Sequence, residues 1–418
     1  MQTENADLLN DPSIRQAGRA LLSLALMDAR NRNLQLLSAF EQAVDSASEA
    51  GQPVEPSAGA QAQWLLGRAG WFAESWLGRN TQRSLGVACP AQPTRTASIA
   101  PWTDACWHMD AGWFDPAPAG ALPDSQSLRT FLLDTLEISL ELLDKTPETD
   151  DALYFFRLAL FVEDLTGERL ITLAQSCGVP LRLERPAVAA PRDPVGVPAA
   201  RWNLGSAPGG FVPDNEKWAH EVRVPEFEID AQPVTWAQFL EFVSDGGYDR
   251  PEWWGEQGWA WLRSAPGGRR GPRHVEQLGA VTRAGGAGAV QQTQFGQGLR
   301  AAGHHPVTHV TWWEADAWCH WAGRRLPDEA EWELAAHAAA RRGFVWGSVH
   351  EWTATSFQPY PGFASDPWAA YSQPYFGRAR AVRGASWSTR RRWVYPKFRS
   401  FALQDADEHF VGFRSCAL

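Results

Sequence analysis

Histidines and carboxylates, the side chains that most often bind metals or move protons, gather in one stretch of the C-terminal half. His304, His305 and His309 lie close together, and Glu314 and His320 follow shortly after. Imidazole and carboxylate ligands suit a transition metal, so one hypothesis is a metal site. Their spacing matches no established metal-binding motif, and the alternative is that they serve the scaffold and a bordering loop.

Two other groups of reactive or charged residues favour structural roles. The basic run GGRRGPR begins at Gly267 and could bind an anion, but a solvated surface loop is the better explanation of such a short run. The cysteines are odd in number, scattered and free of any CxxC pair. We therefore expect reduced thiols rather than disulfides or zinc at Cys89, Cys106, Cys177, Cys319 and Cys416.

The overall charge and hydropathy exclude several classes of protein. The chain has 38 Lys and Arg against 48 Asp and Glu, a net charge of -10, which argues against nucleic acid as a partner. No apolar run approaches the ~18 residues of a membrane span. The start of the chain has neither the basic end nor the apolar core of a signal peptide. We expect a cytoplasmic protein with no membrane partner.

The elements that would position these residues divide the chain into two parts. Apolar residues recur with helical spacing over residues 14–47, 61–79, 127–143 and 151–176, which predicts four long helices. Helices joined by Pro-rich loops indicate an antiparallel bundle, and such bundles place ligand or metal sites between facing helices.

The C-terminal part follows a Pro-rich segment. Residues 185–200 contain several prolines without periodicity and are predicted to form a linker. Beyond them, helices are expected only at 235–244, 312–322 and 327–339, and the Gly- and Arg-rich residues 264–303 are predicted to form a long loop. The chain has 23 Trp, most of them expected in a core that lacks long regular elements. The whole is therefore predicted to be α+β.

A series of motifs in the C-terminal half carries a family resemblance. They include WNLGS at Trp202, FVPDNEKWAHEV at Phe211, HPVTHVTWWEADAWCHWAGRRLPDEAEWE at His305 and RGASWST at Arg383. Residues 201–418 resemble the formylglycine-generating-enzyme-like domain, a C-type-lectin-related fold. The resemblance implies an irregular α+β domain built around Trp and Gly.

Motifs in the N-terminal half resemble one branch of that superfamily. GRAGWFAESWLGRN at Gly67 and LYFFRLALFVEDLTGERL at Leu153 are similar to the DinB-like bundle of ergothioneine-type sulfoxide synthases, over residues 1–184. The segments DALYFFRLALF and DARNRNLQLLSAFE look closest to the selenoneine-forming members. The resemblance implies an oxygen-activating Fe(II) between the domains, which joins sulfur or selenium to the imidazole of trimethylhistidine.

The iron ligands of that family are replaced here. The family binds iron through an HxxxHxE run on one helix face and a GHxxWF segment. This chain reads VEDLTGE from Val162 and GRAGWF from Gly67, so the resemblance places Val162, Thr166 and Arg68 at the three ligand positions. An aliphatic chain, a weak neutral donor and a permanent cation do not make an Fe(II) site, so we predict no cofactor.

The resemblance also marks the positions of acid and substrate-binding groups. Where the family has an acid-donating tyrosine, in a PYxxYS segment, this chain has DPWAAYS. Trp368 stands at that position and Tyr371 is retained nearby, and an indole cannot titrate as a phenol does. No catalytic residue is therefore assigned. By the same resemblance, the candidate substrate-binding residues are Tyr360, Trp352, Phe401 and Arg414.

Further departures concern charge. His350 replaces a tryptophan in the segment GSVHEWT, and Asp405, Asp407 and Glu408 stand where relatives are basic. These acids would impair the binding of a thiol co-substrate that carries carboxylates. On the bundle side, Glu163, Asp164 and Glu168 flank the altered ligand positions, and we expect a salt bridge between them and Arg68 in place of the metal.

Two hypotheses about function follow. The first is a catalytically degenerate paralogue that binds a trimethylhistidine-like molecule by cation–π contacts or regulates a related enzyme. The second is an active synthase that forms a C–S or C–Se bond with a relocated metal site. The concerted loss of the ligand and acid positions favours the first.

Overall fold

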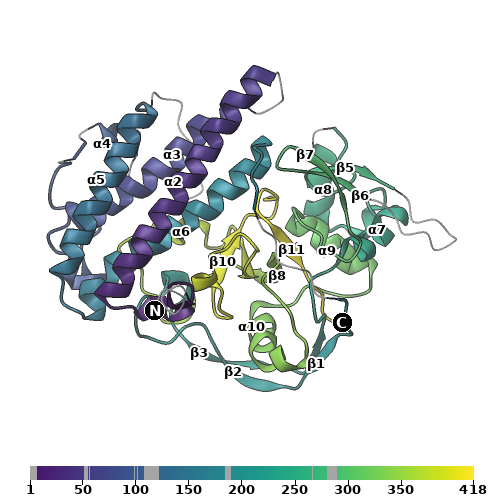
Figure 1. Cartoon of the computed structure of the whole chain (residues 1–418). Coiled ribbons are helices and arrows are strands. Elements are labelled where there is room, and N and C mark those ends of the chain that lie inside the picture. The colour runs from purple at the N-terminus through teal and green to yellow at the C-terminus, as the bar shows by residue number, and fades with distance from the viewer. Residues whose placement is uncertain are drawn as a thin grey trace.

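The computed structural model describes residues 7–50, 55, 57–97, 99–100, 102–107, 122–183, 190–265, 267–279 and 290–418. A helical N-terminal bundle stands beside a C-terminal part built from short strands and helices (Figure 1). The α+β class is therefore confirmed. Among the described residues, no helix combines the length and the apolar content that crossing a bilayer requires.

Four long helices form the bundle, as predicted. Helix α6 contacts α2 and α3, and α3 in turn contacts α5. Shorter helical segments lie between them. The bounds are α2 Arg19–Ala50, α3 Ala58–Ala73, a π-helical turn Glu74–Gly78, a 3-10 segment Arg83–Ala88, α4 Thr103–Cys106, α5 Ser125–Asp144 and α6 Asp150–Cys177.

The ends of α6 follow from its sequence. The Thr149 side chain accepts a hydrogen bond from the Ala152 amide at the N-terminus, where Asp150 also complements the helix dipole. At the other end Gly178 adopts the left-handed conformation, with φ of 71°, which an L side chain rarely adopts. These two caps define the first and last turns of α6.

The C-terminal part is organised around a four-stranded sheet in the order β10-β9-β8-β11. Strands β8 and β11 are parallel and the other pairs are antiparallel. The pairs β1–β4 and β2–β3 form two further small sheets. The bounds are β1 Val195–Val197, β2 Ala200–Leu204, β3 His220–Val224, β4 Phe227–Ile229, β8 His350–Ser356, β9 Arg380–Gly384, β10 Arg399–Ala402 and β11 Val411–Phe413.

The three predicted C-terminal helices are present, together with α8. Thr235, Thr311 and Asp328 each form a reciprocal capping box with the residue three positions later, which fixes the starts of α7, α9 and α10. The bounds are α7 Trp236–Ser244, α8 Glu256–Ser264, α9 Trp312–Trp321 and α10 Glu329–Ala338, with 3-10 turns at Asp214–Glu216, Pro251–Trp253, Ala340–Arg342 and Gln373–Tyr375.

Two predictions about irregular segments need correction. Residues 264–303 are not one long loop, because they contain the antiparallel sheet β5-β6-β7, with bounds Val275–Leu278, Val290–Gln294 and Gln297–Ala301. The predicted linker 185–200 includes β1, which pairs with β4, so its second half is part of the C-terminal fold. Residues 185–189 of that prediction and 280–289 of the loop lie outside the described residues.

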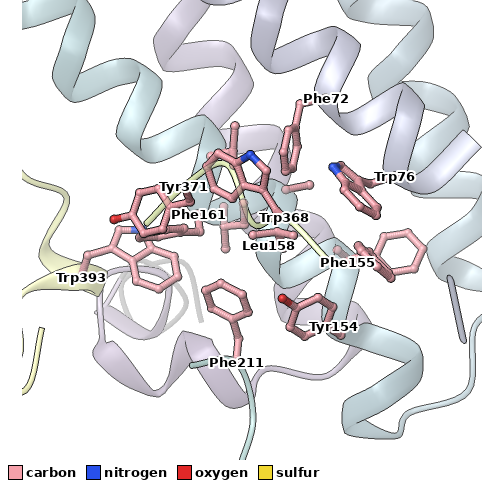
Figure 2. Close-up of a cluster of buried hydrophobic side chains, with 14 of the residues drawn as sticks. Phe72, Trp76, Tyr154, Phe155, Leu158, Phe161, Phe211, Trp368, Tyr371 and Trp393 are labelled. Carbon is pink, nitrogen blue, oxygen red and sulfur yellow. The ribbon is translucent and has the colours of Figure 1, made fainter. Parts of the chain in front are cut away.

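Aromatic side chains fill the contact between the two parts (Figure 2). Phe161 of α6 lies with its ring centroid 4.8 Å from Trp393 and 5.6 Å from Tyr371. Phe72 of α3 lies 4.8 Å from Trp368. Because rings from both parts share one buried cluster, the two parts stabilise each other.

The segment before the bundle also contacts the far end of the chain. The 3-10 helix Pro12–Gln16 packs on the 3-10 helix Arg391–Trp393. Arg15 lies over the ring of Tyr395, with the guanidinium carbon 3.9 Å from its centroid. Arg392 donates a hydrogen bond of 3.0 Å to the carbonyl of Leu9. Residues 9–16 and 391–395 are therefore in contact although they lie far apart in the sequence.

Candidate functional site

A cavity lies between α6 and the central sheet. It encloses about 60 Å³ accessible to a water-sized sphere, well above the ~10–15 Å³ that one water needs. Helix α6 lines it at positions three, four and seven apart, which share one helix face. The lining residues are Leu165, Glu168, Arg169, Thr172, His350, Tyr371, Val382, Phe398, Ser400, Phe401, Ala402, His409 and Val411.

A carboxylate–imidazole pair spans the cavity wall. His350 Nε2 donates to Glu168 Oε1 at 2.7 Å, and the Thr389 hydroxyl donates to the same oxygen at 2.9 Å. Burial opposes ionisation of this carboxyl, yet the His350 imidazole and the hydroxyl hold the pKa of Glu168 below its ordinary value of 4.5. The cavity therefore presents a negative charge.

Two other titratable groups of the cavity, His409 and Tyr371, stay uncharged at neutral pH. Burial lowers the pKa of His409 below its ordinary value of 6.5, so its imidazole is neutral. Burial, together with the carboxylates Asp214 and Glu216, raises the pKa of Tyr371 well above 10. The Tyr371 phenol thus remains protonated, and Arg169 is the positively charged group among the lining residues.

The predicted iron-ligand positions lie on α3 and α6 and offer no ligand set. Val162 is fully buried in the aromatic cluster between the two parts. The Thr166 hydroxyl donates a hydrogen bond of 2.8 Å to the carbonyl of Val162. The guanidinium carbon of buried Arg68 lies 5.4 Å from the ring centroid of Trp64. These side chains do not fit Fe(II), because they contribute no imidazole, thiolate or carboxylate.

Tyr371 lines the cavity, and Trp368 lies behind it in the aromatic cluster. Their rings stack with centroids 4.9 Å apart, and Trp368 also makes an edge contact with Phe72 (Figure 2). Trp368 thus belongs to the aromatic cluster, whereas Tyr371 lines the cavity.

The structure gives the acidic residues of α6 other partners than the predicted Arg68. Arg30 of α2 binds Glu163 in a pair that is buried on both sides. Asp164 accepts hydrogen bonds from Arg392 and from the indole of Trp393. Glu168, as described, pairs with His350. The three carboxylates therefore bind the next helix and the C-terminal part.

Three of the four predicted substrate-binding residues lie away from the cavity. Tyr360 donates to Glu329, and Trp352 donates to the carbonyl of Val310; both side chains are buried. Arg414 forms a fully buried ion pair with Glu351. Phe401 does line the cavity.

The histidine-rich stretch does not form the hypothesised site. Glu314 is held by Arg269 and Tyr248, and His320 pairs with Asp316 at the end of α9. His309 lies against His274, with ring centroids 4.8 Å apart. Across the described ranges, no three His, Cys, Asp or Glu side chains are arranged to hold a metal ion.

The predicted basic and acidic segments bind each other. Arg269 and Arg273 of the basic run both pair with Asp407. Arg270 pairs with Asp249 on the surface. The positive charges of Arg269 and Arg273 are thus compensated within the protein. The negative charge of Asp407 is compensated as well, which weakens the predicted repulsion of a co-substrate that carries carboxylates.

Several cavity residues were not predicted from the sequence. His350 was noted as a replacement without a role, and its partner Glu168 lies far away in the chain. Arg169 lies within the motif LYFFRLALFVEDLTGERL but has no predicted role, and Phe398, Ser400 and His409 lie outside the quoted motifs. The helical spacing of Leu165, Arg169 and Thr172 on the face of Glu168 is the one signal that could have identified a shared surface.

A second cavity lies beside the residues that precede β8 and β11, and α6, α7 and β6 also contribute to its lining. It encloses about 70 Å³ and is lined by neutral polar and aromatic side chains, including Gln175, Ser348, Trp387 and Phe410. The first cavity is therefore the better candidate for chemistry, because it alone of the two contains carboxylate and guanidinium groups.

Comparison with known proteins identifies the relatives of this chain. Residues 183–348 match the sulfatase-modifying factor enzyme 1-like domain. A hercynine oxygenase of Mycolicibacterium smegmatis is 31% identical over 417 residues, which is 84% of this chain and 89% of the relative. A hercynine oxygenase of Mycolicibacterium thermoresistibile is 29% identical over 95% of this chain and 94% of the relative.

A shorter match covers less than half of this chain. The inactive C-alpha-formylglycine-generating enzyme 2 of Mus musculus is 36% identical over 174 residues, 40% of this chain and 53% of that protein. The match to the Mycolicibacterium smegmatis protein, in contrast, extends over both the helical bundle and the domain that follows it. The chain therefore belongs to the hercynine oxygenase family of ergothioneine sulfoxide synthase-like proteins.

Proposed function

We propose that this chain is a binding member of its family that holds a hercynine-like betaine in the cavity between α6 and the sheet, without a resident iron. The observation that carries the proposal is the donor set at the three ligand positions. Val162 has no lone pair, the hydroxyl of Thr166 is hydrogen-bonded to its own helix, and Arg68 would repel a cation.

The lining of the cavity matches the chemistry of trimethylhistidine. A trimethylammonium group is attracted to aromatic faces, which Tyr371, Phe398 and Phe401 supply. A carboxylate is attracted to the guanidinium of Arg169. The imidazole of the ligand would meet the polar pair Glu168 and His350. Each charged or polar part of the betaine thus has a group of suitable chemistry.

The metal test compares the natural chain with a triple variant carrying Arg68→His, Val162→His and Thr166→His. Both are incubated anaerobically with Fe(II), desalted and analysed by plasma mass spectrometry. We expect about one iron per chain in the variant and less than about one tenth in the natural protein, because only imidazoles supply the lone pairs. An unaltered chain that retains about one iron would contradict the proposal.

The ligand test replaces one aromatic wall of the cavity. Phe401→Leu is expected to weaken hercynine binding about 2- to 30-fold in calorimetry, because a cation–π contact contributes about 0.5–2 kcal/mol. Phe363→Leu is the matched control, since Phe363 packs on Phe376 and does not line the cavity. Absence of binding to the natural chain would remove the betaine from the proposal.

The alternative is an active synthase that forms a C–S or C–Se bond with a relocated metal. The hypothesised histidine stretch does not support it, because Glu314 and His320 are engaged elsewhere. A regulatory contact with a related enzyme stays a prediction. Oxygen consumption on addition of hercynine and a thiol or selenol would favour the synthase.

A further inference from the structure

Two carboxylates hold two arginines where the bundle meets the C-terminal part. Arg392 donates to Asp164 at 2.6 and 2.9 Å and to Asp28 at 3.0 Å. Arg390 also pairs with Asp28. Trp393 donates to Asp164 at 2.7 Å. Both oxygens of Asp164 and one of Asp28 are therefore already engaged. We call this place the seam, defined by Asp28, Asp164, Arg390 and Arg392.

A third guanidinium reaches the seam without a carboxylate of its own. Arg32 lies one turn after Asp28 on α2. Its guanidinium reaches α6 close to Gly167, because a Cβ built on that glycine would lie 3.5 Å from the Nη1 of Arg32. Among the described residues, Arg32 has no hydrogen bond and no ion pair. Burial and the neighbouring Arg390 lower the pKa of Arg32 from its ordinary value, because both disfavour its positive charge.

The direct ion pairs leave one guanidinium over. Arg390 and Arg392 pair with Asp28 and Asp164, whereas Arg32 has only the longer-range attraction of Asp164 and Glu168. The Glu168 oxygen Oε1 accepts from His350 and Thr389 instead. The Nε of Arg390 is buried without a hydrogen-bond partner in the described structure, and it lies 3.8 Å from the Oδ1 of Asp164. A partly desolvated cation without a partner is costly, and a bound anion would offset that cost.

The seam is open to solvent on one side. The side chain of Asp28 is 37% exposed and that of Arg390 is 18% exposed, and Arg32 is half-buried. A small molecule can therefore reach the guanidinium groups. The net charge of -10 means that the protein as a whole repels anions, so binding here would depend on the local arrangement.

We propose that Arg32 and Arg390 form a binding site for an oxyanion at the seam between α2, α6 and the segment that carries Arg390. Guanidinium groups bind carboxylate and phosphate oxygens through paired N–H donors, and this shared oxyanion chemistry defines the ligand. The site differs from the betaine cavity, whose lining contains neither arginine. It does not depend on the function proposed above.

The experiment uses potassium phosphate and potassium succinate as probes, with potassium chloride at equal ionic strength as the reference. Thermal unfolding and calorimetry are measured on the full chain, on Arg32→Gln and on Arg129→Gln. Arg129 is the control because it pairs with Glu41 on the surface of the same bundle. We expect an oxyanion to raise the unfolding temperature of the natural chain, and R32Q to weaken its binding about tenfold or more.

The outcomes separate the sources of the oxyanion. A response to phosphate alone assigns a phosphate site, and a response to succinate alone assigns a carboxylate site. No response of the natural chain to either probe overturns the proposal, and so does an equal loss in R129Q. In the potassium chloride reference, R32Q should be as stable as the natural chain, because the substitution relieves repulsion from Arg390. If R32Q does not fold, Arg390→Gln is measured in the same comparison.

Discussion

Replacing Asp164 with asparagine is expected to destabilise the chain by about 3 kcal/mol, the low end of the cost of breaking a buried ion pair. The substitution keeps the shape of the side chain and removes the charge that Arg392 faces. Both partners are buried, with side chains 3% and 0% exposed. Asp28 then becomes the one carboxylate paired with Arg392 among the described residues, and it is 37% exposed and therefore more strongly screened by water.

Urea unfolding followed by tryptophan fluorescence measures this effect. Because Asp164 connects α6 to the C-terminal part, we expect the transition to shift to lower urea and to separate into two steps. The matched control is Glu221→Gln, which breaks the exposed pair with Arg201 and should cost less than about 1 kcal/mol. An equal, small loss in both variants would contradict the importance of the buried pair.

Asp214→Asn is expected to stabilise the chain above pH 7. Asp214 is buried, and one of its oxygens has no hydrogen-bond partner within the described structure. Burial and the charge of Asp366 raise the pKa of Asp214 from 3.8 to about 7. Such a shift corresponds to a penalty of about 4 kcal/mol on the ionised form. Asparagine resembles the protonated carboxyl and avoids this penalty.

The direction of the pH dependence follows from proton binding. Between pH 3.8 and about 7 the folded state keeps a proton on Asp214 that the unfolded state has lost, so stability falls as pH rises through this window. In D214N this fall should disappear, and the two proteins should be nearly equal below pH 4. Denaturant midpoints at pH 4, 6 and 8 provide the measurement.

A neighbouring carboxyl serves as the contrast. Asp366 pairs with buried Lys217 and accepts a hydrogen bond of 2.7 Å from Tyr154 of α6. Asp366→Asn would leave Lys217 without this counter-ion, so it should lower stability at pH 8. Burial raises the pKa of Asp366 above its ordinary value of 3.8, so the loss should shrink as pH falls. If D214N lowered stability to the same extent at pH 8, the raised pKa of Asp214 would be the wrong explanation.

The bundle could be predicted from the sequence because its signals are local. Apolar spacing, the cap at Thr149 and the stop at Gly178 lie within the segments that they define. The sheet β5-β6-β7 could not be predicted in this way. Its strands read VEQL, VQQTQ and QGLRA, with few apolar residues and no clear alternation, because most of their side chains are exposed or half-buried.

The candidate site was only partly predictable, because burial and pairing depend on distant residues. Phe401 and Tyr371 line the cavity, but the same family motifs also indicated Arg414, whose guanidinium is neutralised by Glu351. The sequence likewise suggested Arg68 as the partner of Asp164, whereas Arg392 arrives from the other end of the chain. A motif marks a retained residue and does not distinguish a ligand contact from a core contact.

The contact between the first 3-10 helix and the Arg391–Trp393 segment sets an order of assembly during synthesis. Helices α2 to α6 can fold once Cys177 has left the ribosome, because their mutual contacts are already complete. Asp164 and the aromatic face around Phe161 gain these partners only after Arg392 and Trp393 have been made, more than 200 residues after Cys177. During that interval the nascent bundle exposes apolar surface that the folded protein buries, so it is prone to aggregate until the C-terminal part covers it.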